Sequence, residues 1–125
     1  MCQNIKFKIL PYPKYIIFLK KYVDSINILQ ENKIQIKFCL DEILSNIIEH
    51  SYNLELINLE FIIKPTLTLI IKKKDKSPVI INIKNKNELK ARFKGVGLFL
   101  IKENCLSFDY KFIENISIFK LTFKN

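Results

Sequence analysis

The chain has 125 residues and a formal net charge of +9, and 49% of its residues are hydrophobic. This length fits one compact domain spanning residues 1–125, and the apolar content excludes an intrinsically disordered chain. The longest apolar stretches are far shorter than the roughly 20 residues that cross a bilayer, and the amino terminus lacks the apolar run of a secretory signal. We therefore expect a cytoplasmic protein that does not enter a membrane.

The basic charge is spread along the sequence. Lys72-Lys73-Lys74 is the only run of three lysines. Clustered lysines bind the phosphates of nucleic acids, whereas dispersed lysines are typical of a solvated surface. The sequence therefore favours a solvated basic surface over direct nucleic-acid binding.

A strand and a helix are predicted at the start of the chain. Apolar residues alternate with lysines over residues 5–9, which predicts a half-buried strand that Pro11 and Pro13 end. Apolar residues at helical spacing predict a helix that begins at Lys14. We expect the polar stretch at residues 30–33 to end this helix.

A second helix is predicted from about Ile34 to His50. Its apolar positions share one face: Ile36, Leu40, Ile43, Leu44 and Ile47. Glu42, Asn46 and His50 are spaced four residues apart and therefore share another face. A carboxylate and an amide one turn apart provide a proton acceptor and an oxygen ligand for magnesium. A solvated polar helix face is the alternative explanation of this pair.

Two strands are predicted after the second helix. Residues 59–63 and 67–71 are rich in β-formers and are separated by Lys64-Pro65-Thr66, which predicts an antiparallel hairpin. A polar connection follows from Lys72 to Lys94, with a possible further strand at residues 79–83.

The chain closes with a helix and a second hairpin. The helix is predicted from Gly97 to about Asn104, and strands at residues 107–112 and 116–123 flank the turn Glu114-Asn115. The order of elements predicts an α+β two-layer sandwich, in which helices cover one face of a mostly antiparallel mixed sheet.

The only two glycines of the chain lie together in the segment Lys94-Gly95-Val96-Gly97-Leu98. Glycine lets backbone NH groups approach a ligand closely, and NH groups at the start of a helix bind phosphate. With Glu42 and Asn46, this segment indicates a nucleotide site. A tight loop before a helix, which requires no ligand, is the alternative.

Two motifs of the chain resemble those of a known family. Residues 40–52 resemble the N-box, and residues 95–102 the glycine-rich G2 box, of the histidine-kinase-like (GHKL) ATPase superfamily. The resemblance covers nearly the whole chain and is closest to the bacterial anti-sigma factor serine kinases. It implies the Bergerat, or histidine-kinase-like ATPase, fold.

The resemblance also implies roles for individual residues. Glu42 would act as the general base, and Asn46 would bind the Mg²⁺ that accompanies ATP. Asp75 would accept a hydrogen bond from the adenine amino group. The phosphates would be held by the glycine segment: Lys94, Gly95, Val96, Gly97 and Leu98.

The adenine-binding motif departs from the family pattern. The matching stretch is Asp75-Lys76-Ser77-Pro78, in which Ser77 stands where the family has a glycine. A Cβ at a close backbone contact costs on the order of 1 kcal/mol or more. This departure opens the alternative of a GHKL-fold interaction module that has lost its kinase activity.

The resemblance implies a homodimeric regulatory ATPase. Such a protein would bind a sigma factor and phosphorylate an anti-anti-sigma (STAS) protein on serine. Besides the degenerate interaction module, a basic nucleic-acid-binding domain stays open as the least favoured alternative, and only the net charge of the chain suggests it.

Overall fold

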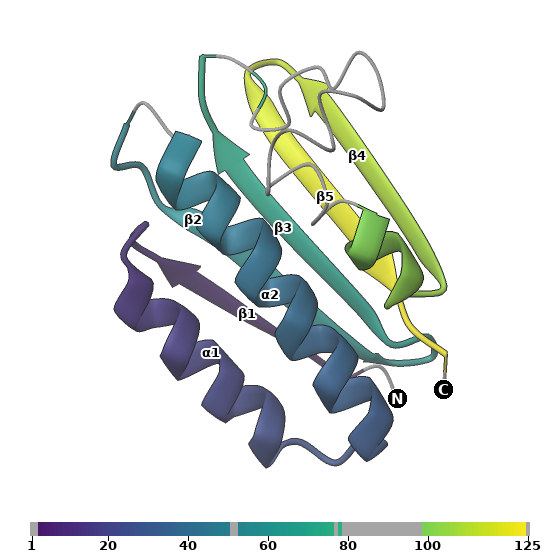
Figure 1. Ribbon diagram of the computed structural model, residues 1–125. Helices are drawn as coiled ribbons and strands as arrows, with labels where there is room; N and C mark the ends of the chain where they lie inside the picture. Colours follow the sequence, from purple (N-terminus) through teal and green to yellow (C-terminus); the bar gives the residue numbers. More distant parts are fainter. Residues whose placement is uncertain (1–2, 51–52, 77, 79–98, 125) are drawn as a thin grey trace.

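The computed structural model describes residues 3–50, 53–76, 78 and 99–124. These residues form one β-sheet and the helices that lie against it (Figure 1). The strands are β1 (Gln3–Ile9), β2 (Ile57–Lys64), β3 (Thr68–Lys74), β4 (Ser107–Ile113) and β5 (Ile116–Thr122). The helices are α1 (Pro13–Ser25), α2 (Gln30–His50) and a short helical segment at residues 99–103.

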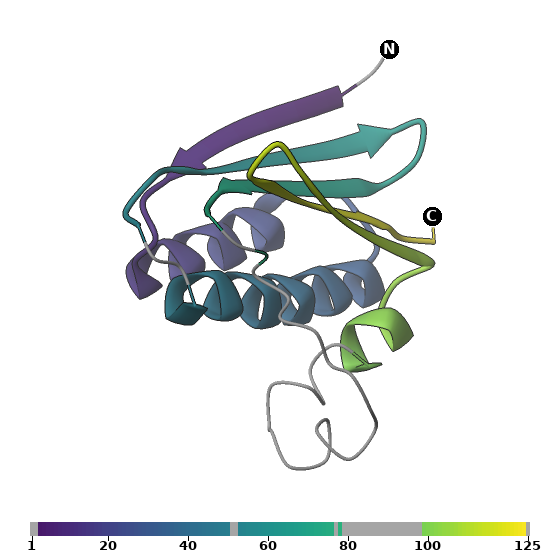
Figure 2. The same ribbon diagram turned by 90° about the horizontal axis from the view of Figure 1, so that it is seen from above.

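The sheet has the strand order β1-β2-β3-β5-β4, and each neighbouring pair is antiparallel. The expected mixture of parallel and antiparallel strands is therefore wrong for the described strands. The reason is that the two hairpins, β2–β3 and β4–β5, lie side by side and meet through the antiparallel pair β3–β5. Seen along the sheet, the described helices all lie on one face (Figure 2). The α+β two-layer sandwich is confirmed.

The turn between β4 and β5 is where the sequence predicts it. Glu114 and Asn115 have positive φ angles of 52° and 63°. Two consecutive residues in the left-handed region are typical of the tight hairpin turn that matches the twist of a sheet. This turn sets the register in which Ile113 faces Ile116.

The boundary between the two helices differs from the prediction. Residues 30–33 form the first turn of α2 and do not end α1, which ends at Ser25. The polar side chains of this turn suit a helix start: Glu31 places a carboxylate near the free backbone NH groups. Asn32 is buried and donates a hydrogen bond from Nδ2 to the carbonyl oxygen of Lys124 at 2.7 Å.

The core fills the space between the sheet and the helices. The predicted apolar face of α2 is confirmed, because its five residues are all buried: Ile36, Leu40, Ile43, Leu44 and Ile47. They pack against inward-facing residues of the central strands, among them Leu59, Phe61, Leu69, Ile71 and Phe119. Within the part of the chain that the structure describes, the helices are too short or too polar to span a lipid bilayer.

Candidate functional site

Glu42 and Asn46 lie one turn apart on α2, beside its buried apolar face. Both side chains are partly buried, because their neighbours Ile43 and Ile47 are in the core. Burial raises the pKa of the Glu42 carboxyl above its ordinary value, and the negative charge of Asp41 raises it further. A carboxylate with a raised pKa holds a proton more strongly and is therefore a better general base.

The short helix at residues 99–103 is anchored to the core. Ile101, in the short helix at residues 99–103, is fully buried and belongs to the core. Cys39 of α2 has its pKa raised to about 12, first by burial and then by the charges of Cys105 and Glu42. Helix α2 and the short helix lie on the same face of the sheet (Figure 2).

Asp75 lies immediately after β3 and is only 2% exposed. Its backbone NH donates a hydrogen bond to the carbonyl oxygen of Asn115, at 2.8 Å, and its Oδ1 accepts one from the NH of Lys76 at 2.8 Å. Its Oδ2 lies 3.8 Å from the Nζ of Lys73. The carboxylate is thus held in place by groups at the end of the β3 strand.

Lys73 is a fully buried lysine that the sequence-based prediction missed. Its Nζ donates hydrogen bonds to Oδ1 of Asn53 and, at 2.9 Å, to the carbonyl oxygen of Lys74. Asn53 also donates to that carbonyl, at 3.3 Å, and so connects the chain just beyond α2 to the end of β3. Burial lowers the pKa of Lys73, against the opposing effects of Asp75 and Glu55.

The three consecutive lysines 72–74 indicate a polar connection beginning at Lys72, and this prediction is wrong. Strand β3 in fact continues to Lys74. The alternation that brings Leu69 and Ile71 inward also brings Lys73 inward, while Lys72 and Lys74 face solvent. This alternation of side chains along the strand is the sequence signal that identifies Lys73 as an inward-facing residue.

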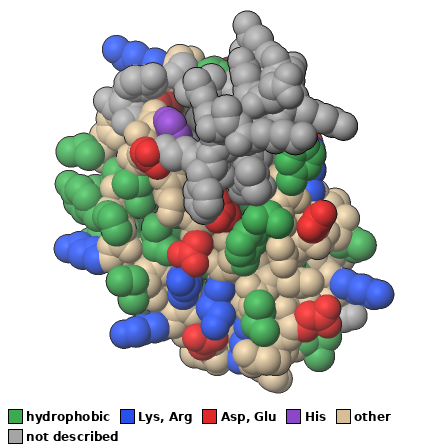
Figure 3. Space-filling model, viewed as in Figure 1, with side chains coloured by type: hydrophobic (Ala, Val, Ile, Leu, Met, Phe, Trp, Pro, Cys, Tyr) green, Lys and Arg blue, Asp and Glu red, His purple; other side chains and the backbone are tan. Residues whose placement is uncertain are grey.

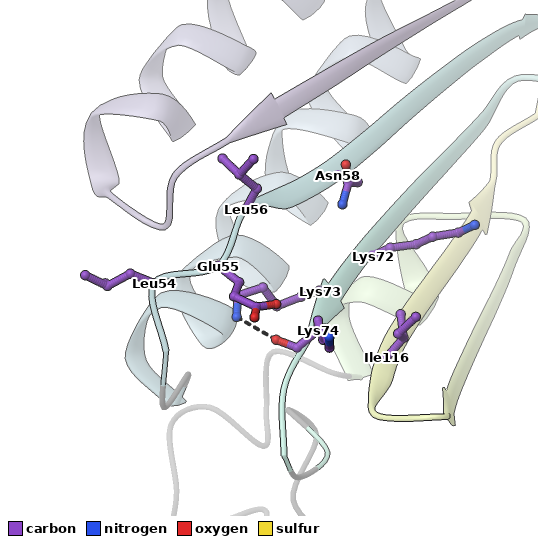
Figure 4. Close-up of a pocket in the computed structure, with 8 residues that line it drawn as sticks. All are labelled: Leu54, Glu55, Leu56, Asn58, Lys72, Lys73, Lys74 and Ile116. Atoms are coloured by element: carbon purple, nitrogen blue, oxygen red, sulfur yellow. Dashed lines mark hydrogen bonds between the residues drawn. The ribbon is translucent and has the colours of Figure 1, made fainter.

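One hollow formed by described residues lies at the end of β3. It has a volume of about 530 Å³, and Figure 4 shows the residues that line it: Leu54, Glu55, Leu56, Asn58, Lys72, Lys73, Lys74 and Ile116. Glu42, Asn46 and Asp75 are not among them. The side chains of Asn58, Lys72 and Lys74 are exposed, whereas Lys73 lines the hollow from the buried side of β3.

Several predicted site residues lie outside the described residues. They are Ser77 of the adenine-binding motif and the predicted phosphate-binding segment Lys94, Gly95, Val96, Gly97 and Leu98. The possible strand at residues 79–83 also lies outside the described residues. The structure places Glu42 and Asn46 one turn apart on α2. It places Asp75 at the end of the central strand β3.

Magnesium in nucleotide sites is usually held by one or two protein oxygens together with phosphate oxygens and water. The side-chain amide of Asn46 fits this role, since its oxygen is a hard ligand. Among the described residues, no group of three or more His, Cys, Asp or Glu side chains is arranged to hold a metal ion.

No protein-family model matches the sequence, and no curated protein matches it.

Proposed function

We propose that this protein is an ATP-binding regulator of the GHKL type that acts like an anti-sigma factor serine kinase. One observation carries the proposal. Glu42, whose pKa is raised first by burial, lies one turn from Asn46 on α2, and the short helix that follows the two glycines lies on the same face of the sheet. A general base, a magnesium ligand and a phosphate-binding segment are the parts that phosphoryl transfer needs near one another.

In this proposal each part has a defined task. The Glu42 carboxylate accepts the proton of a substrate serine hydroxyl as that oxygen attacks the γ-phosphate of ATP. The amide oxygen of Asn46 helps to hold Mg²⁺, which neutralises charge on the phosphates. Backbone NH groups of Gly95, Val96 and Gly97 bind the phosphates, with Lys94 adding positive charge. Asp75 accepts a hydrogen bond from the adenine.

The partners follow from the resemblance of the sequence. The serine would belong to a STAS protein, the regulator would sequester a sigma factor, and it would work as a homodimer in the cytoplasm. Because several of the proposed phosphate contacts are backbone NH groups, single side-chain substitutions in the glycine segment would test them poorly. Glu42 and Asn46 are the informative positions.

A second function is favoured by the Lys73–Asp75 pair. The carboxylate that would bind adenine is almost fully buried and already has a lysine ammonium 3.8 Å from its Oδ2. A carboxylate committed to a buried cation is a weaker acceptor for adenine, because moving it costs the stabilisation of the pair. The alternative is a GHKL-fold module that binds a regulator without using ATP.

Thermal unfolding with nucleotide separates the two functions. If the kinase proposal is right, Mg-ATP or Mg-ADP at a hundred times its dissociation constant adds about 2.7 kcal/mol to the unfolding free energy. We expect Asn46→Ala to lose the magnesium-dependent part of this gain. Glu49→Gln, an exposed carboxylate on the same helix, is the matched control and should leave the gain unchanged.

Phosphoryl transfer to a purified STAS protein tests the catalytic role. We expect Glu42→Gln to keep nucleotide binding and to lose transfer by roughly 10²- to 10⁴-fold, the usual contribution of a general base. If ATP and ADP leave the melting temperature unchanged and Glu42→Gln has no effect on transfer, the kinase proposal is wrong. Binding of a purified sigma factor without nucleotide would then support the interaction module.

A further inference from the structure

The face of the sheet opposite the helices is rich in lysine. We call it the open sheet face (Figure 2). Strand alternation and pairing place these exposed lysines on it: Lys6, Lys8, Lys64, Lys72, Lys74, Lys111 and Lys120. Glu60 and Asp109 are the only carboxylates that the five described strands carry. The lysines that are dispersed in the sequence therefore gather on one surface.

Three of these lysines form a row across the sheet. Lys8 is in register with Asn58, and Asn58 with Lys72. Lys72 is in register with Ile118, and Ile118 is in register with Lys111 on the next strand. Neighbouring strands are about 4.8 Å apart, so successive lysines of the row are about 10 Å apart and the row spans about 20 Å.

Most of these charges are not neutralised by the protein. Within the described part of the chain, Lys6, Lys8, Lys72, Lys74 and Lys120 are exposed and have no ion-pair partner. Glu60 accepts a hydrogen bond from Asn4 at 2.8 Å. Asp109 lies 3.8 Å from Lys111, but both side chains are about 60% exposed, so this pair contributes little.

The helical layer has a different charge distribution. Helices α1 and α2 carry as many lysines as carboxylates: Lys14, Lys20, Lys21, Lys33 and Lys37 against Asp24, Glu31, Asp41, Glu42 and Glu49. Two ion pairs join these helices, Lys20–Asp41 at 2.9 Å and Lys37–Asp24 at 2.8 Å. Acidic and basic side chains are intermingled on this face (Figure 3). The excess positive charge of the described residues therefore belongs to the open sheet face.

We propose that the open sheet face binds the phosphate backbone of double-stranded nucleic acid without reading its bases. A duplex presents one negative charge per about 1.7 Å of its axis, and unpaired lysines gain affinity by releasing its counterions. The 530 Å³ hollow and a second one of about 290 Å³ share Asn58 and Lys72, so the surface around the lysine row is grooved.

A duplex fits this surface better than a single strand. Proteins that bind single strands stack bases on exposed aromatic rings. The aromatic residues of the neighbouring strand β4 instead face the helices, where Phe108 and Tyr110 pack against Phe119. The residues between the lysines of the row are Asn58 and Ile118, which offer no stacking surface.

The test is fluorescence anisotropy of a labelled 20-base-pair duplex with the full chain, between 50 and 200 mM salt. We expect binding at 50 mM salt that weakens steeply as salt rises. The double variant Lys8→Gln/Lys72→Gln should lower the slope of log affinity against log salt by about 2 and weaken binding on the order of tenfold at 100 mM salt. A second double variant, Lys74→Gln/Lys120→Gln, should behave in the same way.

The matched control is Lys14→Gln/Lys21→Gln, which removes the same charge from exposed positions on α1. It should leave the slope nearly unchanged. The proposal is overturned if the wild-type chain fails to bind duplex at 50 mM salt, or if the control weakens binding as much as the sheet variants do. It is also overturned if a single strand binds more tightly than the duplex, or if polyglutamate competes equally well, since the partner would then be an acidic polypeptide.

Discussion

The Lys73 ammonium and the Asp75 carboxylate form an ion pair, with 3.8 Å between Nζ and Oδ2, inside the protein rather than at its surface. The two side chains are 0% and 2% exposed. Removing two charges from water is costly, and the pair compensates only because hydrogen bonds from Lys73 to Asn53 and Lys74 satisfy the ammonium as well. The hydrogen bonds between Asn53 and the residues Lys73 and Lys74 connect the end of β3 to the chain that follows α2.

Removing one partner of this pair should destabilise the protein strongly. We expect Asp75→Ala to lower the free energy of unfolding by about 3–5 kcal/mol, because Lys73 is left as an uncompensated buried charge. The double variant Lys73→Met/Asp75→Ala should recover most of this loss. Urea denaturation measures both changes, with Lys72→Met on the exposed side of β3 as the control, expected within about 0.5 kcal/mol of wild type. If the double variant loses as much unfolding free energy as Asp75→Ala and Lys73→Met lose together, the two charges are not coupled.

Glu42→Gln should stabilise the protein at neutral pH. The folded-state pKa of Glu42 is raised, so the folded chain binds its proton more strongly than the unfolded chain does. The stabilisation that this proton gives is fully present below the unfolded pKa and is lost as pH rises through the folded pKa. At pH 7.5 wild type must keep a charged carboxylate partly buried, which lowers its stability, whereas the amide of the variant is neutral. The variant should therefore melt at a higher temperature than wild type at pH 7.5.

The same difference in melting temperature should shrink as the pH falls below the ordinary glutamate pKa, because the Glu42 carboxyl then becomes neutral like the amide that replaces it. The exposed Glu103→Gln, in the short helix at residues 99–103, is the control and should change little at either pH. A melting temperature of Glu42→Gln that differs from wild type equally at both pH values would mean that charge is not the cause. A gain in stability together with a loss of phosphoryl transfer would indicate that Glu42 is retained for activity.

Ile101 should anchor the segment that follows the glycines. Its side chain is fully buried, whereas the neighbouring Leu100 is 38% exposed. We expect Ile101→Ala to lower the free energy of unfolding by about 2–5 kcal/mol, the usual cost of a core truncation. Leu100→Ala should cost much less. Equal losses in chemical denaturation would show that the short helix does not pack on the core as described.

The tight turn between β4 and β5 offers a stabilising substitution. Glu114 has a positive φ of 52°, which costs roughly 1–2 kcal/mol for a residue with a long side chain. Asn-Gly is the preferred pair in such turns. Glu114→Asn/Asn115→Gly should therefore raise the free energy of unfolding by about 1 kcal/mol in urea. Glu114→Val should lower it, because a branched Cβ fits this conformation poorly.

Much of the fold was predictable because its signals are local. The alternation of residues 5–9 predicts β1, the apolar face of Ile36 to Ile47 predicts α2, and Glu114-Asn115 predicts the last turn. The error at residues 30–33 arose because a polar stretch suits the start of a helix as well as its end. The prediction at Lys72 to Lys74 is wrong because their charge indicates a polar connection, whereas the alternation of inward and outward side chains continues strand β3 to Lys74.

The sequence by itself determined which residues are helical or extended and which faces are apolar, since these properties depend on neighbours within a few positions. Only the tertiary structure decided that Lys8, Lys72 and Lys111 share a row, and that Lys73 is enclosed beside Asp75. The physical reason is that strand order and register depend on contacts between distant segments. A shift of one residue in that pairing would move every side chain of a strand to the opposite face of the sheet.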